Sequence, residues 1–168
     1  MFFKLSSLSV LLAPVSNIGK ASLDWYWGFS QRTPTWSIPA AHTKTHKEHV
    51  LHLTDDAIDL LKTYKTVSKG HYLFSTKENK VIAASTAHAM ITRISKNEWT
   101  AHDIKKRFRS ILADIGIDYY VAESLLNHSK GALDQAYIHT HLEGLKRSAL
   151  KRYHNHLKSN YLWISVVF

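Results

Sequence analysis

Cysteine is absent from this chain of 168 residues. Its absence excludes a disulfide scaffold, catalysis by a thiol and zinc sites built from cysteine. Internal repeats and low-complexity tracts are missing as well. Because 45% of the residues are apolar and 11% are aromatic, the sequence predicts one folded domain, or a domain with short ends, rather than a disordered chain. The lack of cysteine also fits a reducing compartment, and we expect the protein to be cytoplasmic.

Apolar runs are short, and none is long enough to span a bilayer, so no membrane association is predicted. The opening segment "MFFKLSSLSVLLAPV" has Lys4 before a brief apolar run and in that respect is similar to a signal peptide. It lacks a clear cleavage pattern. We interpret residues 3–13 as a buried helix that Pro14 ends, with a signal peptide as the alternative.

Acidic residues are scarce. Lys and Arg number 22 against 13 Asp and Glu, which gives a formal net charge of +9, and 12 histidines are present besides. A basic surface attracts phosphate polyanions and binds them in a salt-dependent way. The charge balance therefore favours a nucleic-acid partner, with a soluble protein that is merely basic as the alternative.

The pattern of apolar and polar residues predicts a mainly helical α+β fold with a small antiparallel sheet. Residues 35–40 and 48–53 are strand-like and flank a charged turn that contains Lys44. Two such segments on either side of a turn predict a β-hairpin.

Helices are predicted along most of the remaining chain. Thr54 is expected to cap the first of them, with Asp55 and Asp56 in its first turn. Ser85 is expected to cap a helix that continues to Ile94. Other predicted elements are a helix at 17–23, a short strand at 71–75, and helices that begin near residues 101, 118, 132 and 142.

The helix predicted over residues 101–115 has an apolar face and a basic remainder. Its apolar positions recur at helical spacing, and Gly116 follows as a residue suited to a helix end. The remaining surface of this helix carries Lys105, Lys106, Arg107 and Arg109.

Four residues of chemical interest follow in order: Lys44 in the hairpin turn, His102 at the start of the basic helix, then His128 and Tyr137. The segment "TKTHKEHVLHL" resembles the lysine hairpin of tyrosine recombinases, the phage integrase family. "TAHDIKKRFRS" resembles the His-x-x-Arg helix of that family, and "LLNHSKGALDQAYIHTHL" resembles its histidine-to-tyrosine segment. "WSIPAAHTKT" is similar to prophage and island integrases in particular. The resemblance covers about residues 5–157, and each residue taken alone also has an ordinary structural explanation.

The resemblance implies DNA integration or recombination through a covalent intermediate. Tyr137 would attack a DNA phosphodiester to give a 3′-phosphotyrosine and a free 5′-hydroxyl. Protein cations would stabilise the charged transition state, so no metal or other cofactor is expected. Lys44 would protonate the leaving 5′ oxygen, His102 would assist proton transfer or hold the phosphate, and His128 would donate to a non-bridging oxygen. The partner is double-stranded DNA, with further contacts expected from Lys47, Lys106, Arg107 and Arg109.

The sequence departs from the family pattern at both arginine positions. Lys105 stands where the second arginine is expected, and the family's Arg-x-x-Glu aligns with "NIGK", which puts Asn17 at the first. Lysine keeps the charge but loses the planar fork that holds two phosphate oxygens, and Asn17 has no charge. We therefore expect impaired cleavage. The alternative is that other cations compensate, with Arg109, one turn further along, as the better substitute.

The resemblance predicts a recombinase catalytic domain over residues 1–158, incomplete at its N-terminus and lacking the core-binding domain that clamps the other face of DNA. For the apolar tail, 159–168, docking on a neighbouring protomer and packing on its own domain are the two alternatives. Two other functions remain open: a DNA-binding remnant of a prophage integrase that does not cleave, and a histidine-rich metal-binding protein. The metal ligands of the latter would come from His42, His46, His49, His139, His141, His154 and His156.

Overall fold

The computed structural model of the chain describes residues 34–43, 46–67, 80, 83–128 and 139–160. The elements predicted at 3–13, at 17–23, at 71–75 and from about 132 lie outside these residues, and so does the tail from residue 161.

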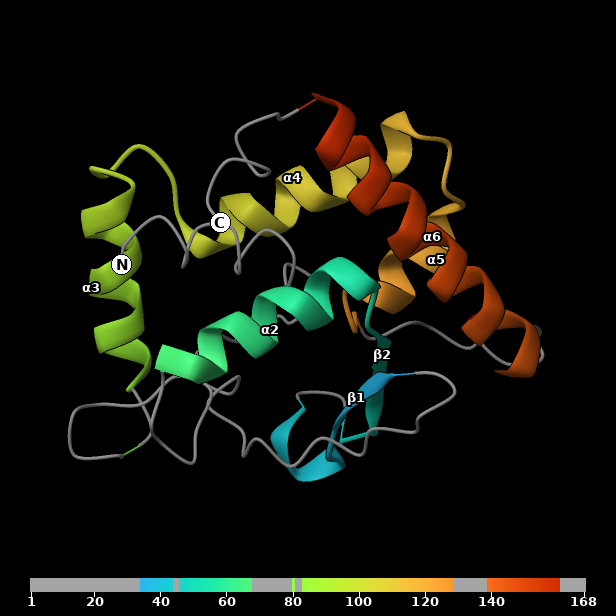
Figure 1. The fold of residues 1–168 in the computed structure, drawn as a ribbon, viewed down its shortest axis with the longest axis horizontal. Helices are drawn as coiled ribbons and strands as arrows, with labels where there is room; N and C mark the ends of the chain where they lie inside the picture. Colours follow the sequence, from blue (N-terminus) through green and yellow to red (C-terminus); the bar gives the residue numbers. More distant parts are fainter. Residues whose placement is uncertain (1–33, 44–45, 68–79, 81–82, 129–138, 161–168) are drawn as a thin grey trace.

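The described part of the chain is a mainly helical α+β fold, as the sequence predicted (Figure 1). Figure 1 shows α2 across the middle, α3 at one end, and α5 and α6 at the other. In chain order the elements are β1 (Thr35–Ile38), the 3-10 turn η1 (Ala40–His42), β2 (His49–His52), α2 (Asp55–Val67), α3 (Ala84–Ile94), α4 (Ala101–Asp114), α5 (Tyr119–Leu125) and α6 (His139–Asn160).

The predicted β-hairpin is confirmed. β1 and β2 pair antiparallel, with Thr35 opposite His52 and Ile38 opposite His49. Alternate side chains of β1, those of Trp36 and Ile38, are buried, as expected for a strand with one face on the core. The connection between the two strands contains the position of Lys44, which lies outside the described residues.

The start of α2 also follows the sequence prediction. The hydroxyl of Thr54 accepts a hydrogen bond from the backbone N–H of Ala57 at 3.4 Å, and Asp55 and Asp56 occupy the first turn. Carboxylates are favoured there by the positive end of the helix dipole. α2 then buries Ala57 and Leu61 against the core.

The predicted N-cap of α3 is wrong. The helix begins at Ala84, and Ala83 is its N-cap residue with an extended backbone and no side-chain hydrogen bond. Ser85 therefore lies inside the first turn. The physical reason is the high helix propensity of alanine, which allows the helical backbone to extend past the serine without a capping side chain.

Both ends of α4 are set by local hydrogen bonds. Thr100 and Asp103 form a capping box at its start. Gly116 follows the other end with a φ of 68°, and the backbone N–H of Ile117 donates to the carbonyl of Leu112 at 2.8 Å. This is a Schellman motif, in which glycine adopts the left-handed conformation at little steric cost.

The core is formed mainly by α4, α5 and α6. α4 buries Phe108, Ile111 and Leu112. The rings of Phe108 and Tyr153 of α6 meet edge to face with centroids 4.7 Å apart, a geometry that adds about 0.5–1.5 kcal/mol to the effect of burial alone. The hairpin and α2 complete the core, whose larger buried members include Trp36, Leu51, Leu61, Val121, Leu125, Leu150 and Leu157.

Polar contacts join α6 to β2. The ammonium of Lys146, which is only 4% exposed, donates to the backbone carbonyl of Val50 and to Oε1 of Glu143, both at 2.8 Å. Oε2 of Glu143 lies 2.9 Å from Nε2 of His52 on β2. We call Lys146, Glu143, His52 and the Val50 carbonyl the α6–β2 clamp.

α6 is also joined to α2 and to α4 by polar side chains. Nζ of Lys158 lies 2.6 Å from Oδ1 of Asp56, and His154 is hydrogen-bonded to the hydroxyl of Thr54. Arg152 donates to the carbonyl of Ile115, at the end of α4. α6 thus makes polar contacts with β2, with α2 and with the end of α4.

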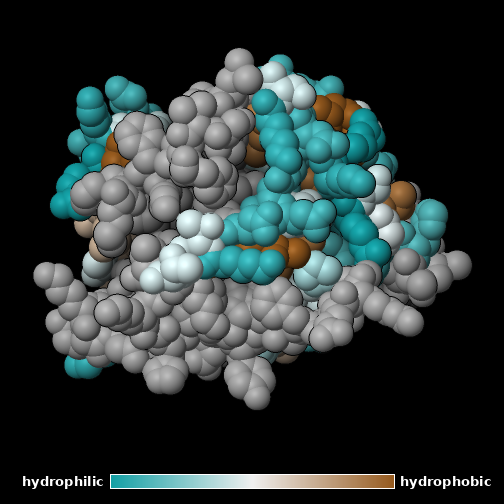
Figure 2. Space-filling model, in the orientation of Figure 1, coloured by the Kyte–Doolittle hydropathy of each residue, from teal (hydrophilic) through white to brown (hydrophobic). Residues whose placement is uncertain are grey.

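The described part of the face in Figure 2 is largely hydrophilic over α2 and α6, with small separate apolar patches. Within the described ranges, no helix combines the length and the apolarity needed to cross a membrane.

Replacing Lys146 with Met is expected to lower the free energy of unfolding by about 3 kcal/mol, because Glu143 loses its cation and the Val50 carbonyl loses its donor. Urea denaturation measures this. The control is Lys62→Met, because Lys62 is 71% exposed and its ion pair with Asp59 spans 3.9 Å; its cost is below about 0.5 kcal/mol. Equal effects of the two substitutions would contradict a stabilising role for the clamp.

Candidate nucleic-acid interface

The residues singled out from the sequence divide into two groups. Asn17, Lys44 and Tyr137 lie outside the described residues. The structure does place the other candidates, which are Lys47 and His102, the four cations of α4, and His128.

The capping box fixes where the basic helix begins. Thr100 donates its backbone N–H to Asp103 at 3.0 Å and its hydroxyl at 2.7 Å. These hydrogen bonds, together with one from Lys106, lower the pKa of the Asp103 carboxyl from 3.8 to about 2. The box makes Ala101 the first helical residue and puts His102 in the exposed first turn.

Three of the cationic side chains share one stripe of α4. His102, Lys105 and Arg109 follow at the i, i+3, i+7 spacing that aligns side chains along a helix. Lys105 is partly buried, and the other two are exposed. Lys106 points away from the stripe and lies 3.2 Å from Asp103, and Arg107 is about 200° around the helix from Lys105.

The position of His128 is set by the end of α5. Asn127 has a φ of 51°, a left-handed conformation that asparagine tolerates better than most residues. The backbone N–H of His128 donates to the carbonyl of Glu123 at 3.2 Å, and that of Asn127 donates to the carbonyl of Ser124 at 3.3 Å. These two hydrogen bonds form a second Schellman motif.

Glu123 connects His128 to the stripe on α4. Its Oε2 lies 2.6 Å from Nδ1 of His128, and its Oε1 lies 2.9 Å from Nε of Arg109. The arginine contact is an ion pair by distance only, because Oε1 accepts no well-directed hydrogen bond within the described part of the chain. The guanidinium of Arg109 also lies over the ring of Tyr119, 5.1 Å from its centroid. His128 and Arg109 are therefore neighbours.

His49 of β2 lies where four elements meet. Burial lowers the pKa of its imidazole from 6.5 to about 4, and the charges of Lys146 and, more weakly, Lys105 act in the same direction. The backbone of Leu125 and the carboxylate of Glu143 oppose this shift. These interactions put β2, α4, α5 and α6 within reach of one imidazole, whose Nε2 has no hydrogen-bond partner among the described residues.

A family model described as "Phage integrase family" matches residues 21–143. The chain belongs to the phage integrase family. The matched segment of this integrase begins after Asn17 and contains the positions of Lys44, His102, Lys105, His128 and Tyr137. Membership implies DNA integration or site-specific recombination as the activity of the family. No curated protein gives a significant match to the chain.

The histidine pairs of this integrase do not gather around a metal in the part that the structure describes. Among those side chains, no group of three or more histidines and carboxylates lies close enough to hold a metal ion. His49, considered from the sequence as a possible ligand, is buried at the junction of four elements instead.

Sequence reasoning missed two carboxylates that pair with basic side chains of other elements, Glu123 and Glu143. Glu123 precedes His128 by five residues, and the end of α5 lies between them. This spacing indicates a contact between the two side chains only when the end of α5 is known. Glu143 is close to Lys146 at i, i+3, an ordinary surface pattern. The structure packs this pair against β2, with Lys146 buried and Glu143 partly exposed. Hydrogen bonds from His52 and Lys146 outweigh the effect of partial burial and lower the pKa of Glu143 to about 2.

The integrase fold should lose stability in acid. Between pH 6.5 and about 4, the unfolded chain binds a proton at His49 that the folded chain does not, so the free energy of unfolding falls with falling pH. The full effect is roughly 3 kcal/mol. Below pH 4.5, protonation of Glu143 in the unfolded chain adds to the loss. Urea denaturation at pH 7 and pH 4.5 measures the difference.

The control pair for this pH dependence is His49→Gln and His88→Gln. Glutamine does not titrate, so the first substitution should flatten the dependence above pH 4.5. The second removes an exposed histidine of α3 and should leave the dependence unchanged. A parent protein that is equally stable at both pH values would contradict the buried, neutral state of His49.

Proposed function

We propose that this integrase chain binds duplex DNA through the cationic stripe of α4 and the end of α5, and that it cleaves DNA poorly or not at all. The observation that carries the proposal is that α4, α5 and α6 pack together and that Lys146 of α6 is hydrogen-bonded to β2. In the sequence, Lys44 precedes β2, α4 carries His102 and Lys105, His128 follows α5, and Tyr137 precedes α6.

The roles of the reacting groups follow from the family resemblance. Tyr137 is the nucleophile in this proposal, and Lys44 is the acid that protonates the leaving 5′ oxygen. His102 and His128 contact the phosphate. Lys47, Lys106 and Arg107 are proposed to contact neighbouring phosphates, which fixes the position of the protein without reading the base sequence.

The impairment is proposed from the two arginine positions. A donor oriented toward a developing oxyanion contributes about 10²–10³ to the rate, and an arginine directed at a phosphate contributes roughly 10³–10⁵. Lys105 supplies charge without a planar fork, and Asn17 supplies no charge. The two losses do not simply add, because such residues act as a unit.

The extreme case of this proposal is a chain that occupies DNA without any cleavage. It rests on the same surface and differs only in the chemistry of Tyr137. The ion pair of Arg109 with Glu123 favours the opposite outcome, because it brings one guanidinium next to His128. Covalent trapping on DNA separates these alternatives.

DNA binding should depend steeply on salt. If three or four cations of α4 reach phosphates, the logarithm of the binding constant falls with the logarithm of the salt concentration at a slope of about −3. Fluorescence anisotropy with a labelled duplex measures the slope. Lys105→Ala should reduce its magnitude by about one, whereas Lys62→Ala on α2 should leave it unchanged. A flat response would argue against a surface that grips phosphates.

Cleavage is tested with a duplex nicked so that a covalent protein–DNA intermediate cannot religate. We expect little trapped protein from the parent chain, and much more from Lys105→Arg combined with Asn17→Arg than from either change alone. Tyr137→Phe removes the nucleophile and should abolish any trapping. Robust trapping by the parent chain would show that other cations compensate, and no trapping by the double variant would reject the arginine explanation.

A further inference from the structure

Glu123 is an acidic side chain within a surface proposed to bind a polyanion. It is 9% exposed and lies on α5 between two basic groups. A carboxylate so close to DNA would repel phosphate, and its burial removes most of its own hydration. Neither effect helps DNA binding unless the carboxylate acts through its neighbours.

We propose that Glu123 is a positioning residue that holds the imidazole of His128 and the guanidinium of Arg109 side by side, so that both donate to one DNA phosphate. This inference rests on the proposed function. Beyond that function, it specifies which side-chain atoms face DNA and explains why a buried acid lies among the cations.

His128 makes two hydrogen bonds to Glu123, one from its backbone and one from its ring. Its backbone N–H donates to the carbonyl of Glu123 at 3.2 Å, and its Nδ1 lies 2.6 Å from the carboxylate of Glu123. A carboxylate only accepts hydrogen bonds, so the partner assigns the hydrogen to Nδ1. Nε2 is then the nitrogen directed to DNA, and in the charged ring it donates to a phosphate oxygen. The side chain is 44% exposed, which leaves room for that contact.

Arg109 is held by the same carboxylate and by one aromatic ring. Its Nε lies 2.9 Å from Oε1 of Glu123, and its guanidinium lies over Tyr119. Arg109 follows Lys105 by one turn on the same stripe. Arg109 therefore brings a planar guanidinium next to His128. A guanidinium can bind two phosphate oxygens at once, which the ammonium of Lys105 cannot do.

A positioning role for Glu123 and simple electrostatics predict opposite effects of removing this side chain on DNA binding. Removing any acid from this chain raises its net charge by one, which strengthens the attraction to DNA. Removing Glu123 should instead weaken binding, because His128 and Arg109 lose their fixed positions and a charge-assisted hydrogen bond to phosphate is lost.

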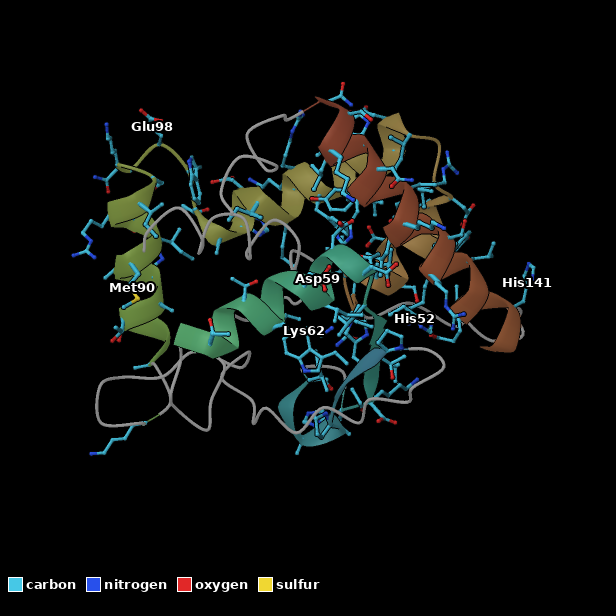
Figure 3. All side chains as sticks on the ribbon, in the orientation of Figure 1. His52, Asp59, Lys62, Met90, Glu98 and His141 are labelled. Carbon is cyan, nitrogen blue, oxygen red and sulfur yellow. The ribbon has the colours of Figure 1, made fainter. Side chains whose placement is uncertain are left out.

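The test compares three variants of the full chain that carry the same change of charge. Glu123→Leu removes the acceptor and keeps the volume, and Glu123→Gln keeps an acceptor oxygen without the charge. Glu98→Gln removes an exposed acid in the connection between α3 and α4, away from α5 and α6 (Figure 3). Anisotropy with a labelled duplex of random sequence is expected to show about tenfold weaker binding for Glu123→Leu, a smaller loss for Glu123→Gln and no loss for Glu98→Gln.

A combined variant and a spectrum distinguish positioning from a general structural role. Added to His128→Asn, Glu123→Leu should cost less than it does in the parent chain, since coupled residues are not additive. Long-range ¹H–¹⁵N spectra of the ring should show a protonated Nδ1 in the parent and in Glu123→Gln, and should lose this preference in Glu123→Leu.

Two results would overturn the inference: binding by Glu123→Leu as tight as by Glu98→Gln, or a ring spectrum of His128 that is unchanged by Glu123→Leu. If the parent chain binds no duplex DNA, the proposed function fails. The ring spectrum then still decides whether Glu123 holds His128.

Discussion

The buried ammonium of Lys146 is the constraint on which the arrangement of this fold depends. A charge removed from water has to be paired and hydrogen-bonded where it stands, and Lys146 finds its acceptors on Glu143 and on the backbone of Val50. One acceptor belongs to α6 itself, so the other fixes the position of α6 along β2. With α6 held there, Tyr153 meets Phe108 of α4. The hairpin, α4 and α6 are thus oriented together.

The same chemical device occurs twice in the molecule. In the α6–β2 clamp, Glu143 accepts from a histidine of one element and a cation of another. At the candidate interface, Glu123 is hydrogen-bonded to His128 and forms an ion pair with Arg109. A carboxylate shared in this way orients two cationic or polar groups that come from different segments. Four of the basic side chains in the described part of the chain are therefore held by two glutamates.

Sequence reasoning succeeded where structure is decided locally. The hairpin, the start of α2 at Thr54, and α4 with its apolar face are read from strand patterns, capping residues and helical spacing. It failed at Ser85, where helix propensity outweighed capping preference. It also missed the roles of Glu123, Glu143, Lys146 and His49, whose partners come from other segments. No local pattern shows that a lysine on a polar helix is buried.

The two Schellman motifs bear on the order in which contacts form during folding. α4, its glycine turn and α5 are neighbours in sequence, and both helix ends are closed by bonds that span five residues. The contacts of α6 with β2 and with Thr54 join residues 91 to 100 positions apart. Closing such a loop costs chain entropy before any contact is gained, and non-local contacts slow folding for that reason. The histidine at the end of α5 is placed by the local unit, whereas the docking of the hairpin belongs to the slow, long-range step.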